Sequence, residues 1–330
     1  NANALEIWTD VNGIYTANPK IVKQSFPIKF LSYKEAMELS HFGAEVLYPP
    51  TVKPVMEKNI PVYIRNTFDN KKPGTIISVN SDSNSTVKGI THIKKIALLT
   101  IEGSGMIGVP GFSKKLFDEI SSNNINIIMI TQASSEHSIC IGIQESEAVK
   151  AKKLVDNAFK YEIESNILNP CKIEDKLSII ALVGDKMKNH QGISGKMFSA
   201  LGKNNINVKA ISQGSSERNI TAVIDEKDVK KALNTLHERF FEKNIKQINL
   251  FIIGTGNVGS KLLKQIDQQS EYLKEKLKLK LRLIAISNSK KMLFNDSGIN
   301  IEKFSPLIDH AEKANLETFI SKAIKLNLRN

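Results

Sequence analysis

The chain has 330 residues, 41% of them apolar, so it is long enough for two or more hydrophobic cores and has an ordinary globular composition. No apolar run approaches the roughly 20 residues of a membrane span, and no signal sequence is visible, so we expect no membrane association. The formal net charge of +12 raises nucleic-acid binding as an alternative, but the densest basic run, Lys274 to Arg282, has no aromatic stripe and is better explained as a solvated surface.

The two cysteines, Cys140 and Cys171, lie far apart in the sequence, and Cys140 falls in an apolar strand. Buried free thiols in a reducing cytoplasm are therefore expected rather than a disulfide. The six histidines show no spacing of metal ligands, so no metal site is predicted.

The first segment combines a strand with a polar turn. LEIWTDVNGIYTANPK, from Leu5 to Lys20, begins with a strand pattern and continues through Asp10 and Gly13. On its own this pattern has an ordinary explanation, because Asp-x-Asn-Gly is a common turn. A helix is predicted within the next stretch, Ser32 to Val55. A Ser/Asn-rich linker, Val79 to Gly89, then separates this segment from the middle of the chain.

The middle of the chain contains an internal duplication. NNINIIMITQASSEHSI begins at Asn123 and NNINVKAISQGSSERNI begins at Asn204, so the offset is 204 − 123 = 81 residues. The same offset runs without a gap from Ile96, which aligns with Leu177. Repeats in general often stack as core units that bind no ligand.

Each copy predicts a βαββ unit. An apolar strand is followed by a Gly-rich loop, a helix with apolar residues at helical spacing, an Asn-Asn stop and two further strands. Glycines in the loops let backbone N–H groups approach a small ligand; they are Gly103, Gly105, Gly108 and Gly111 in the first copy, and Gly184, Gly192 and Gly195 in the second.

Polar residues at the end of the second strand are matched between the copies. They are Gln132 with Gln213, Ser134 with Ser215, Ser135 with Ser216, and Glu136 with Glu217. Polar groups at a strand end need partners, so such a cluster suits hydrogen bonds to a zwitterion such as an amino acid. A turn built from Ser and Glu would have the same composition.

The last segment, NLFIIGTGNVGSKLLKQI, is an apolar strand, a GxGxxG string and an amphipathic helix, which is the context that a dinucleotide-binding fingerprint requires. Its binding residues would be Gly254, Gly256, Asn257, Val258 and Gly259. A second apolar strand, Leu281 to Ile286, ends in SNSKK, where Ser289 and Lys290 offer donors and positive charge instead of an acidic residue. This favours NADP over NAD.

Residues 90–245 resemble the tandem ACT regulatory region of the aspartate kinases, with ITQASSEHS and ISQGSSERN as the most specific strings. The resemblance implies that the repeats, about 94–165 and 175–240, bind an end-product amino acid, typically threonine in kinases fused to homoserine dehydrogenase. The effector-binding residues that it implies are Met106, Gly108, Gln132, Ser134, Gln191, Gly192, Gln213 and Ser215.

Residues 1–80 resemble the C-terminal part of the amino-acid-kinase fold, through the turn after Leu5 and the string FGAEVLYP. The resemblance implies ATP contacts, with Mg, at Thr9, Asp10, Tyr15, Lys20, Glu45 and Val46. Glu45 stands where many members of that family carry Lys. Residues 247–330 resemble the first part of the NAD(P)-binding domain of a homoserine dehydrogenase.

Together these resemblances predict a piece of a bifunctional aspartate kinase–homoserine dehydrogenase, cytoplasmic, with a partial amino-acid-kinase fold, two ferredoxin-like ACT modules and the start of a Rossmann fold. The family's Gly-rich N-terminal lobe and the dehydrogenase substrate domain lie outside the sequence, so we expect no complete catalytic site. ACT modules pair at strand edges, so a homodimer or higher oligomer is expected. The identity of the effector, the number of occupied sites and the exchange of strands between modules stay open.

Overall fold

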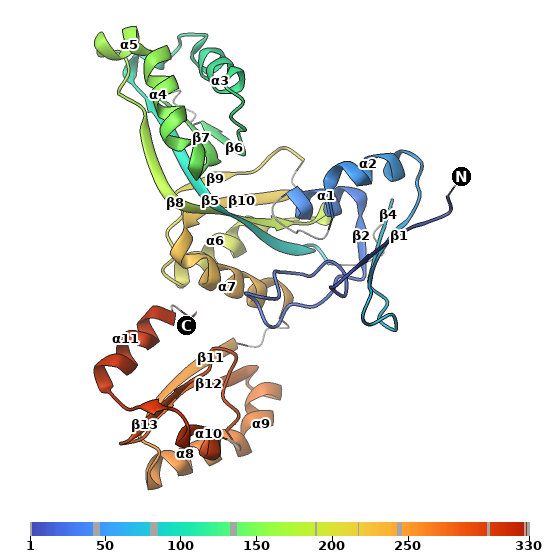
Figure 1. Cartoon of the computed structure of the whole chain (residues 1–330), viewed down its shortest axis with the longest axis vertical. Helices are drawn as coiled ribbons and strands as arrows, with labels where there is room; N and C mark the ends of the chain where they lie inside the picture. Colours follow the sequence, from blue (N-terminus) through green and yellow to red (C-terminus); the bar gives the residue numbers. More distant parts are fainter. Residues whose placement is uncertain are drawn as a thin grey trace. The chain divides into compact units, whose positions relative to one another are not determined.

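The computed structural model describes residues 2–41, 47–79, 85–132, 137–188, 190–216, 218–242, 246–301, 304–326 and 328 (Figure 1). The chain forms two compact units. The first comprises residues 1–18, 26–195 and 206–229, and the second comprises residues 19–25, 196–205 and 230–330. No helix in the described ranges is long and apolar enough to cross a membrane.

A four-stranded sheet opens the first unit, in the order β1-β3-β4-β2. Its strands are β1 (Leu5–Thr9), β2 (Phe30–Ser32), β3 (Val62–Asn66) and β4 (Thr75–Ser78), and the helices are α1 (Tyr33–His41) and α2 (Pro49–Glu57). The predicted strand and helix are both present. Burial of one apolar face of the sheet and of α1 builds the core, which includes Ile14, Leu31, Leu39, Ile64 and Ile77.

The two repeats follow, and their matching helices and strands keep the sequence offset. The first copy contains α3 (Phe112–Ser122), β6 (Met129–Gln132), β7 (Ser138–Gln144), α4 (Ala148–Ala158) and the short α5 (Lys160–Glu164). The second contains α6 (Ile193–Lys203), β9 (Ala210–Ser212), β10 (Asn219–Asp225) and α7 (Val229–Phe241). The helix α3 and the strands β6 and β7 begin 81 residues before α6, β9 and β10, so the duplication is present in the structure as well as in the sequence.

Two long strands, β5 (Gly89–Glu102) and β8 (Lys172–Val183), join the copies into one six-stranded sheet, in the order β6-β7-β5-β8-β10-β9 (Figure 1). Residues 96–102 of β5 pair with β7, whereas residues 89–93 pair only with the end of β8, at 179–183. The register shifts between these two parts of β5. Each half-sheet therefore takes its fourth strand from the strand that opens the other half.

Left-handed residues mark the points where the long strands pass from one half-sheet to the other. Lys95 has φ of 57° and Lys176 has φ of 55°, and the two positions are 176 − 95 = 81 residues apart. A non-glycine residue with positive φ is uncommon and here accompanies the shift in register. The simple order of strands within each copy was predicted, but the use of residues 89–93 as the edge of the second half-sheet was not.

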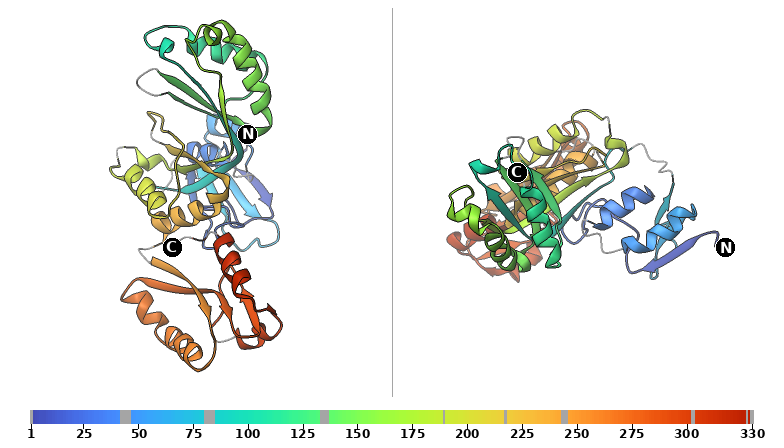
Figure 2. Two further views of the ribbon diagram at one scale, coloured as in Figure 1. Left: turned by 90° about the vertical axis from the view of Figure 1, so that its left-hand side faces the viewer. Right: turned by 90° about the horizontal axis from the view of Figure 1, so that it is seen from above.

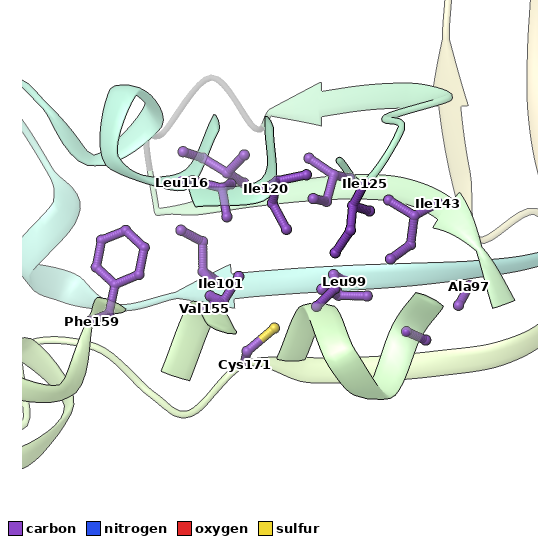
Figure 3. Close-up of a cluster of buried hydrophobic side chains, with 14 of the residues drawn as sticks. Ala97, Leu99, Ile101, Leu116, Ile120, Ile125, Ile143, Val155, Phe159 and Cys171 are labelled. Atoms are coloured by element: carbon purple, nitrogen blue, oxygen red, sulfur yellow. The ribbon is translucent and has the colours of Figure 1, made fainter. Parts of the chain in front are cut away.

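The core of the first half-sheet lies between its strands and the helices α3 and α4, which lie on the same side of the strands in Figures 1 and 2. Leu116 and Ile120 of α3, Leu99 of β5 and Val155 of α4 are almost completely buried in one cluster (Figure 3). Burial of each such side chain contributes about 1.5–3 kcal/mol relative to leaving it exposed. The cluster fixes α3 on the sheet and so positions the loop that precedes it.

The second unit contains a four-stranded sheet, in the order β11-β12-β13-β14. Its elements are β11 (Lys246–Ile253), α8 (Asn257–Gln268), α9 (Ser270–Glu275), β12 (Leu279–Ser287), β13 (Lys291–Phe294), α10 (Phe304–Asp309), β14 (Glu312–Lys313) and α11 (Leu316–Leu326). The strands β11 and β12 are parallel and separated by helix, as the predicted βαβ unit requires. The strand β13 is antiparallel to β12, because the Asn288 side chain accepts the N–H groups of Lys290 and Lys291 and closes a tight turn.

Candidate functional site

A pocket of about 310 Å³ lies at the start of α3. It is lined by the loop after β5, by the first turn of α3 and by the ends of β6 and β7. The lining residues are Met106, Gly108, Val109, Pro110, Gly111, Phe112, Ser113, Gln132 and Ile139. Its volume is within the range of small-molecule sites, about 300–1,000 Å³.

The second copy has a pocket of about 410 Å³ at the equivalent place. It is lined by Met187, His190, Gln191, Ile193, Ser194, Gln213 and Ile220. Every one of these residues lies 81 positions after a residue that lines the first pocket. Two pockets with the same origin therefore occupy matched places in the repeats.

Each pocket opens at a helix N-terminus. Gly111 precedes α3 with φ of 109°, and its counterpart Gly192 precedes α6 with φ of 83°. The N-cap residue of α3, Gly111, has no side chain to cap the helix, and no cap from another described side chain is seen. The first N–H groups of a helix and its dipole favour a negative group, so a carboxylate suits this position.

The polar residues of the second pocket are already connected. Ser194 of α6 donates a hydrogen bond of 3.4 Å to Oε1 of Gln213, at the end of β9. Both Gln132 and Gln213 are exposed, and buried methionines, Met106 and Met187, lie beneath the pockets. The combination of an amide, a hydroxyl and helix N–H groups over an apolar floor can bind both ends of a zwitterion with a small side chain.

The structure brings together five of the predicted effector residues, Met106, Gly108 and Gln132 in the first pocket, and Gln191 and Gln213 in the second. Gly192 shapes the loop but does not line the second pocket, and Ser215 is exposed beyond the lining. Ser134 falls outside the described residues.

Sequence analysis missed the serines at the first turn of each helix, Ser113 and Ser194, and the rim residues Val109 and His190. The serines could have been found, because they are matched at the offset of 81. At the rim the offset aligns unlike residues, Val109 with His190 and Pro110 with Gln191, so the repeat gave no signal there.

The predicted ATP segment forms a local polar network in the first unit. Thr9 donates to Asp10 at 3.1 Å, and the Asn12 side chain donates to the Tyr15 hydroxyl at 3.3 Å. Asn66 of β3 donates to Asn12 at 2.7 Å and holds the turn against the sheet. Lys20 belongs to the other unit and borders a cavity of about 30 Å³ there. Glu45 and Val46 fall outside the described residues.

The glycine string of the second unit has the geometry of a dinucleotide-binding turn. Gly254 has φ of 99°, and its N–H donates to Ser287 O at 2.7 Å, which joins the ends of β11 and β12. A Cβ at Gly259 would lie 1.9 Å from Gly254 O, so only glycine lets α8 pack this closely. Gly256 is exposed at the N-terminus of α8, beside Asn257 and Val258, where a pyrophosphate would bind. Ser289 and Lys290 are exposed on the turn after β12.

Comparisons with known proteins find family models for two parts of this chain. A family model described as ACT domain matches residues 99–159 and 180–240, again 81 residues apart. The amino acid kinase family model matches residues 1–66. The chain is 42% identical to bifunctional aspartokinase/homoserine dehydrogenase 1 of Arabidopsis thaliana over 325 residues, and 40% identical to the bifunctional aspartokinase/homoserine dehydrogenase of Haemophilus influenzae over 327 residues. These alignments cover 96% and 99% of this chain.

The chain is a homologue of the bifunctional aspartokinase–homoserine dehydrogenases. It spans 36% and 40% of the length of these two relatives. We refer below to residues 1–66 as the kinase segment and to the two copies as the ACT repeats.

Two solved structures of aspartate kinases resemble this aspartokinase–homoserine dehydrogenase homologue. The aspartate kinase of Clostridium acetobutylicum has a TM-score of 0.67 and 30% identity, with 72% of this chain and 55% of that chain covered. Aspartokinase III of E. coli in complex with aspartate and ADP, in its R-state, has a TM-score of 0.63 and 26% identity, with 73% and 53% covered. The fold of the kinase segment and ACT repeats is therefore that of aspartate kinases.

Proposed function

We propose that this chain is the regulatory core of a bifunctional aspartate kinase–homoserine dehydrogenase, and that both ACT pockets bind an end-product amino acid, threonine, for feedback inhibition. The observation that carries the proposal is the pair of matched pockets, each with a glutamine at a strand end opposite a helix N-terminus. E. coli aspartokinase III has been solved with lysine and aspartate in its T-state, so an amino-acid effector has a precedent among similar structures.

The chemistry of threonine fits the pockets. Its carboxylate is suited to the helix N–H groups, and its ammonium and hydroxyl to the oxygens of Gln213 and Ser194. Its methyl group would lie over Met187. Among the lining residues that the structure describes, neither pocket has an acidic side chain to pair with the long cationic side chain of lysine.

The parent enzyme would phosphorylate aspartate with ATP and Mg and interconvert aspartate semialdehyde and homoserine with NADP or NAD, in the cytoplasm. Thr9, Asp10 and Tyr15 would lie on the ATP side of the kinase site, and the open approach at Gly256 would admit the pyrophosphate of the dinucleotide. The Ser289–Lys290 turn favours the 2′-phosphate of NADP.

The strands β6 and β9 form the two edges of the six-stranded sheet as described. Strand edges have backbone groups available for a partner strand, so a homodimer or higher homo-oligomer through the ACT repeats accompanies the proposal. Effector binding would then stabilise one packing of the repeats and shift the attached catalytic domains by its differential affinity for the two states.

Isothermal titration of this chain with threonine, with lysine, methionine and ATP as comparisons, tests the proposal. Saturable threonine binding should weaken by roughly 10- to 100-fold in Gln132→Ala or Gln213→Ala, the loss of a hydrogen bond to a charged group. Gln144→Ala, an exposed glutamine at the opposite end of β7, should leave the affinity unchanged. A chain that binds none of the amino acids would instead be a passive connector between catalytic domains. Tight, salt-dependent binding of DNA or RNA would favour the nucleic-acid alternative.

A further inference from the structure

The first helix of the kinase segment begins with a capping box that has an additional partner. Ser32 Oγ accepts the backbone N–H of Glu35 at 3.0 Å, and Glu35 Oε2 accepts the backbone N–H of Ser32 at 2.9 Å. A capping box needs only one carboxylate oxygen. The other oxygen, Glu35 Oε1, accepts the backbone N–H of Asp185 at 3.0 Å, in the loop that follows β8 of the second ACT repeat.

The side chain of Asp185 also contacts the start of α1. Its Oδ2 accepts a hydrogen bond from Ser32 Oγ, and its Oδ1 lies 3.2 Å from Nε of Arg218, the residue just before β10. The first residue of that strand, Asn219, donates to Glu38 of α1 at 2.7 Å. The chain segments that flank the second pocket, just after β8 and at the start of β10, therefore both contact α1 or the residue that caps it.

The kinase-segment side of this contact is buried, whereas the Asp185 side chain is 29% exposed. Glu35 is 1% exposed and Ser32 is 5% exposed. Lys88, 2% exposed, donates to Phe30 O at 3.2 Å; burial lowers the pKa of its ammonium group, and the nearby Glu35 carboxylate opposes that shift. Buried ionic groups of this kind are costly to separate, since removal of one partner leaves the other without compensation. The contact is therefore expected to hold α1 and the loop in one fixed relation.

The first repeat shows what the fold requires without this joint. Gly103 N–H donates to His137 O at 3.1 Å, as Gly184 N–H donates to Arg218 O at 2.9 Å, so the backbone arrangement is the same. The positions that correspond to Asp185, Arg218 and Asn219 are occupied by Ser104, His137 and Ser138. The charged groups of the second repeat are thus not needed to form the loop. Asp185 and Asn219 instead make hydrogen bonds with the kinase segment.

The second pocket is adjacent to the joint. Asp185 begins a short 3₁₀ turn that ends at Met187, which lines the pocket, and Asn219 precedes Ile220, which also lines it. We propose that Ser32, Glu35 and Asp185 form a coupling joint through which a change in the second-repeat loop and a change at the start of α1 accompany each other. A role of this joint in effector regulation rests on the proposed function. The coupling between the loop and α1 does not depend on it.

Amide hydrogen exchange on this chain tests the joint from both sides. Glu35→Gln keeps a single acceptor oxygen, so its side chain can accept the backbone N–H of Ser32 or that of Asp185, but not both. We expect amide exchange to rise roughly tenfold across residues 187–194, and not only at the amide that loses its acceptor. Asp185→Asn should raise exchange in α1, residues 33–41, to a similar degree. Ser104→Ala, the matched position of the first repeat, should leave both segments unchanged.

If Glu35→Gln changed exchange only in α1, and Asp185→Asn only in residues 187–194, the coupling joint would be refuted, whether or not any amino acid binds. If threonine binds, its addition should slow exchange in α1 of the wild-type chain and not in Asp185→Asn; an equal response in the variant would also overturn it. If each substitution changed exchange on the other side of the contact but the chain did not bind threonine, the joint would be supported and the proposed effector site refuted.

Discussion

Substitution of Gly184 by alanine tests how the ends of the repeats are packed. Gly184 has φ of 174°, an extended conformation that any residue adopts, so backbone strain does not require glycine there. Space does. A Cβ would lie 2.3 Å from the backbone oxygen of Thr86, just before β5. The matched Gly103 has the same relation to Ile167 O, also at 2.3 Å, so the constraint belongs to the repeat.

The magnitude follows from this overlap. The contact involves backbone on both sides, so the chain at Thr86 has to move by roughly 1 Å, and overpacking of this kind costs about 1–3 kcal/mol. Reduced freedom of the unfolded chain returns about 0.4–1 kcal/mol. We therefore expect Gly184→Ala to destabilise the sheet by about 1–2 kcal/mol.

Amide exchange of the β5 and β8 peptides as a function of urea measures the opening free energy of this sheet without assuming that the whole chain unfolds in one step. Gly202→Ala is the control, because Gly202 lies in α6 with no atom near the added methyl group and alanine favours helix by up to about 1 kcal/mol. A Gly184→Ala variant that is as stable as this control would refute the packing argument.

Three further outcomes are expected. Burial lowers the pKa of His92 to about 4 from its usual value near 6.5, so the unfolded state takes up the proton first, and roughly 2–3 kcal/mol of stability should be lost as the pH falls from 6.5 to 4; His92→Gln should flatten this acid limb of a urea-midpoint titration. Leu116→Ala should destabilise the first repeat by about 2–5 kcal/mol in the same exchange assay, against less than about 0.5 kcal/mol for the exposed Val149→Ala. Lys290→Ala should weaken binding of NADP but not of NAD in a fluorescence titration, and an equal loss for both cofactors would contradict its proposed contact with the 2′-phosphate.

The features that sequence analysis predicted are local or repeated. The strand at Leu5, the helices that follow the Gly-rich loops, and the glutamines at the ends of β6 and β9 could be predicted because their signals lie within a few residues or recur at the offset of 81. The tight approach at Gly259 follows from the spacing of the glycine string in the same way.

The features that it missed depend on distant partners. Nothing in the residues 89–93 distinguishes a strand that pairs with 179–183 from the continuation of a linker, because strand pairing is decided by register across the sheet. The antiparallel turn of β13 rests on the side chain of Asn288, and the second role of Glu35 rests on a backbone N–H that lies 185 − 35 = 150 residues further along the chain.

The interleaving of the long strands also sets an order of events during synthesis. Gly89 pairs with Val183, so 183 − 89 = 94 residues have to be translated before the segment at 89–93 meets its partner. At about 5–20 residues per second, that segment waits roughly 5–19 s while the first repeat folds between the two parts of the second. The first repeat is therefore synthesised completely before the second repeat, whose sheet needs residues 89–93, can form. A second repeat expressed without the residues that precede the first would lack this strand of its half-sheet.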